Sequence, residues 1–528
     1  MTILPSHARA RYGWWHPHGW PERLKIFGLL AIAFAVWGWF DVRLRGTVDP
    51  NNQGIHKTDF TVYTEAGAAF FDGRAPYEVT NPRGWGYLYP PPFAMLVAPL
   101  DALDTRTQVL IWFAVSVAML YGCYAESVRI ARILAPARQQ NVVFGPVPLA
   151  VGWASVVAAA LPALNCLQRG QVGVAKLYLL LLGFRLCVGS RSWLQSCLAG
   201  AVLALPIVLK VTPLVPVGML VAASLIAAWR SAERRAAFGR ANALAGGVLC
   251  GLVLWLVLLP AAFVGWSTNL NHLSTWWHSV AINVEHSSSD EFAGDSASPR
   301  NQSLSNAVER FGNWAHHVFA GGANDFDPRA ERMQGHTFVM DAPSVAVAIA
   351  LARILAAGLL VWATCRVAWN RDWMGMAAAV GLACVATLIL SPISRGHYYV
   401  LLAPAVMYSG AWLAERARPR WTLAAVAIPA ALSVAHYLAV DVIGRVGLLG
   451  LGISLWYAVM CSTLALSRRR EQAAREMLVA GVQDFRRLPA RPVGRGLLDQ
   501  PADQAAALTD RAPSYRDDLY ARADDGSR

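Results

Sequence analysis

Acidic and aromatic side chains gather in a polar stretch that follows the first apolar segment of the chain. The stretch contains Asp59 in K-T-D-F-T-V-Y, and Tyr63 follows four residues later. That spacing places the two side chains on one face of a helix. A carboxylate can take a proton from a hydroxyl while that hydroxyl attacks an electrophile. Asp59 is therefore a candidate general base, and the alternatives are a solvated loop acid or a helix cap.

A tyrosine and proline run, Y-L-Y-P-P-P, occupies Tyr87–Pro92 in the same polar stretch. Prolines cannot continue a helix, so we expect an extended turn. Tyrosine favours the interface between membrane and water. Tyr87 and Tyr89 therefore belong either to a plain interfacial turn or to the wall of a lipid or sugar site. Gln171, in the later motif L-Q-R-G-Q, is a further candidate for contact with substrate.

Several cationic side chains stand at the ends of apolar segments. They are Arg169 in L-Q-R-G-Q, Lys210 in L-K-V-T-P, and Arg395 and His397 in S-P-I-S-R-G-H-Y-Y. Each could extend its charge to the membrane surface with no further role. Together they could form an anion site, and a departing phosphate oxyanion needs such stabilisation.

The segment Asn301–Arg310, N-Q-S-L-S-N-A-V-E-R, lies in a second long polar region. A capping residue followed by a short amphipathic helix is one interpretation. Amide groups such as those of Asn301 and Gln302 also bind sugar hydroxyls, which is the other interpretation. The sequence contains no Walker loop, no G-x-G-x-x-G after a strand and no H-E-x-x-H, so ATP-driven transport and zinc proteolysis have no support.

Composition indicates a helical membrane protein. Of the 528 residues, 55% are hydrophobic and 15% are charged, whereas soluble proteins carry about 25% charged residues. The apolar residues form long runs, and a run of about 20 spans a bilayer as a helix. The net charge of +13 comes from basic residues scattered among loop ends. That distribution fits cytoplasmic loops and does not predict a nucleic-acid partner.

We expect an all-α polytopic protein with about twelve transmembrane helices. Arginine-rich short loops predict a cytoplasmic side, which places two long polar loops, about 43–107 and 266–342, outside. A basic cytoplasmic leader covers residues 1–23, the membrane domain 24–466, and a largely disordered cytoplasmic tail 467–528. The expected spans are about 24–42, 108–131, 146–164, 172–188, 194–209, 213–229, 243–263, 343–369, 374–390, 397–413, 421–440 and 446–466.

Seven short motifs between Asp59 and Tyr399 together resemble glycosyltransferase family 87. They are D-F-x-V-Y, G-R-x-P-Y, Y-x-Y-P-P, Q-R-G-Q-V, L-K-x-T-P, N-Q-S-L and S-P-I-S-x-x-H. The family comprises polyprenyl-phosphate-mannose-dependent α-mannosyltransferases with the type-C glycosyltransferase fold. The resemblance implies an inverting hexosyltransferase whose catalytic base is Asp59 and whose His397 lies near the donor phosphate. This chain has Arg395-Gly396 where the family often has an aromatic residue, and an added cation suits a phosphate.

The same resemblance implies the partners: a polyprenyl-phosphate sugar, a glycolipid or glycan acceptor, and the bilayer. We expect no cofactor and no metal, because side-chain cations can stabilise the leaving phosphate. The expected location is a bacterial cell or inner membrane, crossed many times, with the site facing outside or the periplasm. The alternatives are a transporter or lipid flippase, a type-C transferase using another lipid-linked sugar such as arabinose or glucose, and a membrane scaffold.

Overall fold

The fold is helical throughout the part of the chain that the computed structural model describes. Within that part, β pairing is limited to the isolated bridges Thr80–Gly86 and Asn301–Arg395. The expected leader at 1–23 and the tail from residue 468 lie outside it. The prediction of an all-α fold is confirmed. The described residues are 32–41, 58–80, 86–134, 146–281, 300–319, 343–416 and 418–467.

Every expected span from the second to the twelfth coincides with a helix or with consecutive helical segments. Seven helices in the described residues are long and apolar enough to cross a membrane, and the count of twelve stays a prediction. The bounds are α4 Thr105–Leu134, α5 Pro146–Arg169, α6 Gly173–Gly189, α7 Trp193–Leu209, α8 Leu214–Trp229, α9 Arg234–Val253, η4 Leu254–Leu258, α10 Leu259–Val264, α15 Pro343–Trp369, α16 Trp373–Leu390, η7 Gly396–Leu401, α17 Leu402–Ala414, α18 Pro419–Leu438 and α19 Leu448–Leu466.

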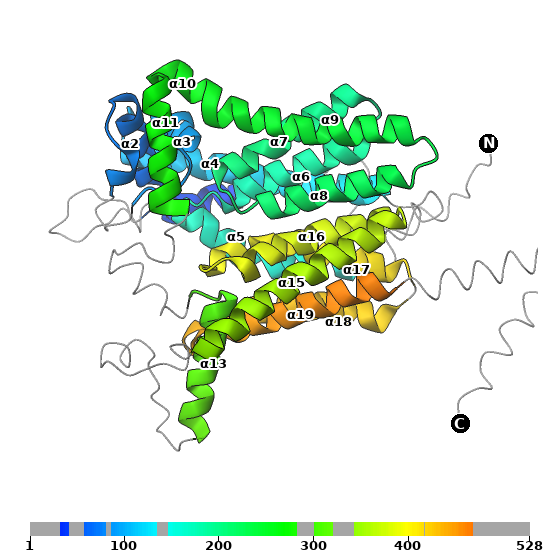
Figure 1. Cartoon of the computed structure of the whole chain (residues 1–528). Helices are drawn as coiled ribbons and strands as arrows, with labels where there is room; N and C mark the ends of the chain where they lie inside the picture. Colours follow the sequence, from blue (N-terminus) through cyan, green and yellow to red (C-terminus); the bar gives the residue numbers. More distant parts are fainter. Residues whose placement is uncertain are drawn as a thin grey trace, which may run out of the picture. The chain divides into compact units, whose positions relative to one another are not determined.

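Shorter helices lie beside these long ones at one end of the bundle (Figure 1). Helix α2 packs against α3, while α11 contacts α3 and α10. Helix α13 contacts α19, α15 and α16. Their bounds are α2 Phe60–Phe71, η2 Pro76–Glu78, α3 Pro91–Val97, η3 Ala98–Leu100, α11 Trp266–Trp276, η5 Trp277–Ala281 and α13 Leu304–Phe319.

The proline run begins a helix instead of holding the extended turn expected from the sequence. Pro90 is the residue before α3, and Pro91 and Pro92 are its first two residues. Proline suits the first helical turn, because its fixed φ is close to the helical value and the amide hydrogen that it lacks would have no partner there. The prediction of an extended turn was therefore wrong for Pro91 and Pro92, whereas Tyr87–Pro90 lie before the helix.

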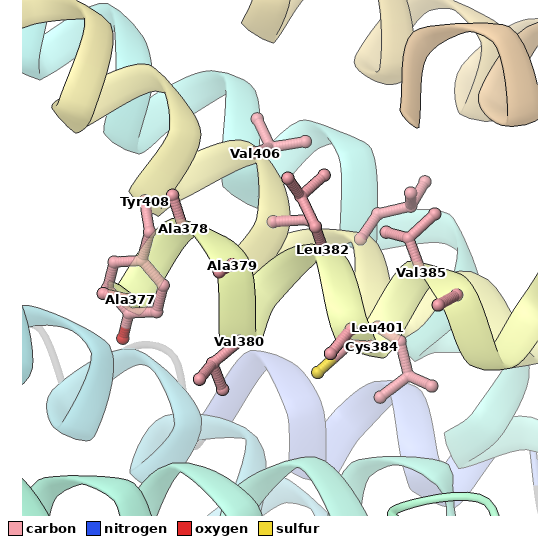
Figure 2. Packing of buried hydrophobic residues seen from close by; sticks show 14 of the residues in the cluster. Ala377, Ala378, Ala379, Val380, Leu382, Cys384, Val385, Leu401, Val406 and Tyr408 are labelled. Carbon is pink, nitrogen blue, oxygen red and sulfur yellow. The ribbon is translucent and has the colours of Figure 1, made fainter. Parts of the chain in front are cut away.

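Helix α16 forms the centre of the hydrophobic core, and all but its ends are buried. Its inner turns consist largely of alanine, which lets α17, α15 and α8 approach closely. Figure 2 shows Ala378, Ala379 and Leu382 of α16 close to Val406 and Tyr408 of α17. Protein interiors are close-packed, so a buried helix such as α16 has no room for added methylene groups.

We expect Ala379→Leu to destabilise the fold by roughly 1–3 kcal/mol, because Ala379 is fully buried and overpacking forces strain. Thermal unfolding of purified protein in detergent would measure the loss. Ala348→Leu is the matched control, since Ala348 is exposed on α15. Equal melting temperatures for the two variants would contradict this account of the core.

Candidate active site

A turn at the end of α5 fixes the position of Asp59. Gly170 adopts a φ of +67°, and the backbone N–H groups of Gly170 and Gln171 donate to the carbonyls of Leu167 and Cys166. This pattern is a Schellman motif, in which glycine tolerates the left-handed conformation. The turn exposes the carbonyl of Arg169, which accepts a hydrogen bond of 3.0 Å from the backbone N–H of Asp59.

The carboxylate of Asp59 is turned towards α5. Asp59 occupies the capping position of α2, yet its side chain makes no capping hydrogen bond. Instead its Oδ2 accepts a hydrogen bond from Nε2 of Gln171 and lies 3.8 Å from Nε of Arg169. The positive end of the α2 dipole favours a negative charge at this position. The helix-cap interpretation therefore does not describe this side chain.

A chain of hydrogen bonds extends from Asp59 into the protein. Oε1 of Gln171 accepts from the hydroxyl of Tyr89 at 3.1 Å, and the hydroxyls of Tyr89 and Tyr63 lie 3.1 Å apart. Burial raises the pKa of both phenols, which keeps them protonated and able to donate. Because an ionised carboxylate only accepts, the amide of Gln171 must present its nitrogen to Asp59.

Aromatic rings surround this chain of hydrogen bonds. The rings of Phe60 and Trp112 stack with centroids 4.9 Å apart, and Tyr63 meets Tyr89 edge to face at 5.0 Å. Tyr87 belongs to the same cluster, but its hydroxyl donates to the carbonyl of Pro90 and accepts from the N–H of Ala94. These two bonds give Tyr87 a structural role at the start of α3.

Two lysines, the half-buried Lys210 and the buried Lys176, lie near the aromatic cluster. Lys210, directly after α7, donates to the hydroxyl of Tyr398 at 2.7 Å and lies 5.6 Å from the ring centre of Tyr89. Lys176 of α6 is 3% exposed, donates to Thr212 and lies 5.8 Å from the ring centre of Tyr398. Neither lysine pairs with a carboxylate among the residues that the structure describes. Buried charges normally have partners of opposite charge.

The loop between α16 and α17 brings the later motif to the same place. His397 is 2% exposed, and its backbone carbonyl accepts from the thiol of Cys166. The Arg395 guanidinium is largely buried, and Arg395 pairs with Asn301 in a β bridge. The positive charges of Lys210, Lys176 and Arg169 all act on His397. The cations of three distant motifs therefore converge with Asp59 at one end of the helices.

The N-Q-S-L motif divides into two roles. Oδ1 of Asn301 accepts from the backbone N–H groups of Ser394 and Ser303, which fixes the amide. Gln302 donates from Nε2 to the carbonyl of Gly444 and accepts at Oε1 from the N–H of Gly450. Gln302 thus ties this loop to η8 (Val440–Gly444) and α19, and its predicted role in substrate binding stays a prediction.

Sequence reasoning missed two residues of this site, Lys176 and Tyr398. A lysine inside the apolar run of α6 is itself a signal, because charge is costly there and usually functional. Tyr398 lies in the S-P-I-S-R-G-H-Y-Y motif, and its contact with Lys210 of the L-K-V-T-P motif became evident only from the structure. Among the described residues, no group of three or more His, Cys, Asp and Glu could hold a metal ion.

A helical membrane protein with a buried acid and several buried cations at one end has the features of a membrane-embedded transferase. The family model described as Glycosyltransferase family 87 matches residues 87–392, which is more than half of the chain. The protein belongs to glycosyltransferase family 87 and is an integral membrane glycosyltransferase. No curated protein and no solved structure matches the chain.

The matched range includes Tyr89, Gln171 and Lys210 but ends before His397 and begins after Asp59. The contacts described above connect these outer residues to the matched part. Asp59 bonds to Arg169 and Gln171, and the carbonyl of His397 bonds to Cys166. The site therefore extends beyond the segment that identifies the family.

We expect Gly170→Ala to abolish most glycosyl transfer. A Cβ at this position would lie 2.7 Å from Oγ1 of Thr58 and 2.9 Å from Cβ of Phe60. The positive φ adds a strain of about 1–3 kcal/mol. Transfer by isolated membranes would be measured beside Gly358→Ala, whose Cβ would meet nothing within 4 Å. Full activity of Gly170→Ala would show that the turn does not position Asp59.

We expect Gln171→Leu to lower turnover by roughly 10- to 100-fold, because misplacing a reacting group slightly has effects of this size. Tyr89→Phe should have a smaller effect, since it leaves the bond from Gln171 to Asp59 intact. Both rates would be measured on protein of verified monodispersity. A larger loss in Tyr89→Phe than in Gln171→Leu would contradict the proposed order of contacts.

Proposed function

We propose that the protein transfers mannose from polyprenyl-phosphate mannose to an acceptor hydroxyl, with inversion at the anomeric carbon. Membership of glycosyltransferase family 87 supports a transferase rather than a transporter or scaffold. The observation that carries the proposal is that Asp59 is linked through Gln171 and Tyr89 to Lys210, and that Lys210 and the buried Lys176 lack carboxylate partners among the described residues. This reaction requires a carboxylate that accepts a proton and positive charges that bind a phosphate.

In the proposed reaction, the acceptor oxygen forms a bond to the anomeric carbon while the bond from that carbon to the phosphate oxygen breaks. Asp59 takes the proton of the acceptor hydroxyl as the new bond forms. The bonding electrons leave with polyprenyl phosphate, and attack from the opposite side inverts the carbon. Gln171 and the phenols behind it hold the carboxylate in place before the acceptor arrives.

The cations stabilise the negative charge that develops on the leaving phosphate. Lys210 and Lys176 flank Tyr398, and Arg169 lies on the side of Asp59. Fixed cations in a site sheltered from water are worth more than the same charges in water.

We place this reaction on the non-cytoplasmic face. The site lies where α5 and α7 end and where α6 begins. Arginines gather at the opposite ends of the long helices, and positively charged loops favour the cytoplasm. Those arginines include Arg132, Arg185, Arg230, Arg234, Arg366 and Arg418.

We expect Asp59→Asn to lower transfer by a factor of about 10² to 10⁴, the usual effect of removing a general base. The assay uses membranes supplied with labelled polyprenyl-phosphate mannose and measures label in the acceptor fraction. Asp72→Asn is the matched control, because the Asp72 side chain is 60% exposed and pairs with Arg74 at the surface. Wild-type rates from Asp59→Asn would end the assignment of Asp59 as base.

The donor is tested in the same membranes with polyprenyl phosphates that carry mannose, glucose or arabinose. Transfer from the mannose lipid above the other two supports the proposal. A preference for glucose or arabinose would support the transferase activity but contradict mannose as the donor sugar.

A further inference from the structure

The end of α18 places unpartnered polar groups against the motif loop that carries His397. His436 is 2% exposed, and neither its Nδ1 nor the hydroxyl of Tyr437 has a hydrogen-bond partner among the described residues. Almost no surface of either atom reaches solvent. A buried polar atom without a partner is costly, and in native proteins it calls for an explanation such as an absent ligand.

Gly396 brings these groups next to the site. A Cβ on Gly396 would lie 2.9 Å from the hydroxyl of Tyr437 and 3.7 Å from Nε2 of His436. Gly396 is flanked by Arg395 and His397 in the chain, and Arg169 is close enough to Tyr437 for its charge to act on it. The end of α18 therefore faces the loop that carries Arg395 and His397.

Two further unpartnered groups lie on the same loop or beside it. Nε2 of His397 has no hydrogen-bond partner in the described part of the chain, and the same holds for Nδ2 of Asn301. The amide of Asn301 is held with its nitrogen available, because its oxygen already accepts from Ser394 and Ser303. The bridge between Asn301 and Arg395 keeps this amide beside the loop.

The chemistry of these four groups differs from that of the lysine side. An amide nitrogen donates, a phenol donates and accepts, and an imidazole nitrogen does either according to its tautomer. A phosphate only accepts and is best met by cations, of which Lys210 and Lys176 lie around Tyr398. Sugar hydroxyls both donate and accept, so a ring with several hydroxyls satisfies a neutral, mixed set of this kind.

We propose that His436, Tyr437, His397 and Asn301 form a subsite for the hydroxyl groups of the donor's sugar ring. This inference rests on the proposed function. It assigns recognition of the sugar to residues other than those that bind the lipid phosphate. Gly396 is required because a side chain there would occupy the space in front of Tyr437.

The test compares two probes on purified full-length protein: farnesyl phosphate, which lacks a sugar, and farnesyl-phosphate mannose. We expect Tyr437→Phe and His436→Ala each to weaken binding of the mannose probe by about 5- to 10-fold, as for loss of one hydrogen bond. Binding of farnesyl phosphate should not change. Lys210→Ala should weaken both probes, because it acts on the phosphate.

Tyr457→Phe is the control, since it removes a buried hydroxyl that bonds to the carbonyl of Ala356 away from the site. Equal losses for both probes in Tyr437→Phe, or no loss for either, would overturn the subsite. Tyr437→Phe keeps the ring, so it tests the hydroxyl without a large change in packing. Turnover of the mannose probe by wild-type protein is measured in parallel, and absence of turnover would instead refute the proposed function.

Discussion

The arrangement of the site depends on one contact, the hydrogen bond between the backbone of Asp59 and the carbonyl of Arg169. It joins a loop near the start of the chain to the end of α5. The carbonyl is available because Gly170 turns the chain away at the last helical residue. The same turn carries Arg169 and Gln171 to the carboxylate, so the three consecutive residues Arg169–Gln171 supply its anchor, its charge partner and its hydrogen-bond donor.

The remaining elements bring several positive charges to the same place. Cations from α6, from the end of α7 and from the loop after α16 lie close enough for their charges to act on His397. Holding such charges together away from water is unfavourable unless a negative group joins them. The aromatic rings of the α2 and α3 region shelter the site and therefore strengthen its interaction with an anion.

Much of the fold follows directly from the sequence. Long apolar runs predicted the positions of the long helices between α4 and α19, but not those of α11 and α13, because length and hydrophobicity determine which segments suit a bilayer. The motif residues were also identified from the sequence, since charge at the end of an apolar run is unusual. Lys210 and His397 were selected in this way, whereas Asp59 was selected from its spacing with Tyr63, and the structure brings the three to the same end of the helices.

The roles of individual side chains were harder to predict. Tyr87 and Tyr89 are two residues apart and similar in type, yet the hydroxyl of Tyr87 is used by the backbone whereas that of Tyr89 supports Gln171. Asn301 and Gln302 differ in the same manner, with Gln302 tied to η8 and α19. Contacts between distant segments determine which lone pairs and hydrogens remain available for a substrate. A local sequence pattern does not specify those contacts.

The division between framework and site has a physical basis in these contacts. A polar group whose partners are all backbone atoms stabilises one conformation and has nothing left for a ligand. A buried group without a partner is a cost to the fold, and binding of substrate removes that cost. Tyr437 and His436 are of the second kind, although they belong to none of the seven motifs. Unsatisfied hydrogen-bonding capacity, more than residue type, therefore distinguishes the groups available to substrate from those that hold the helices together.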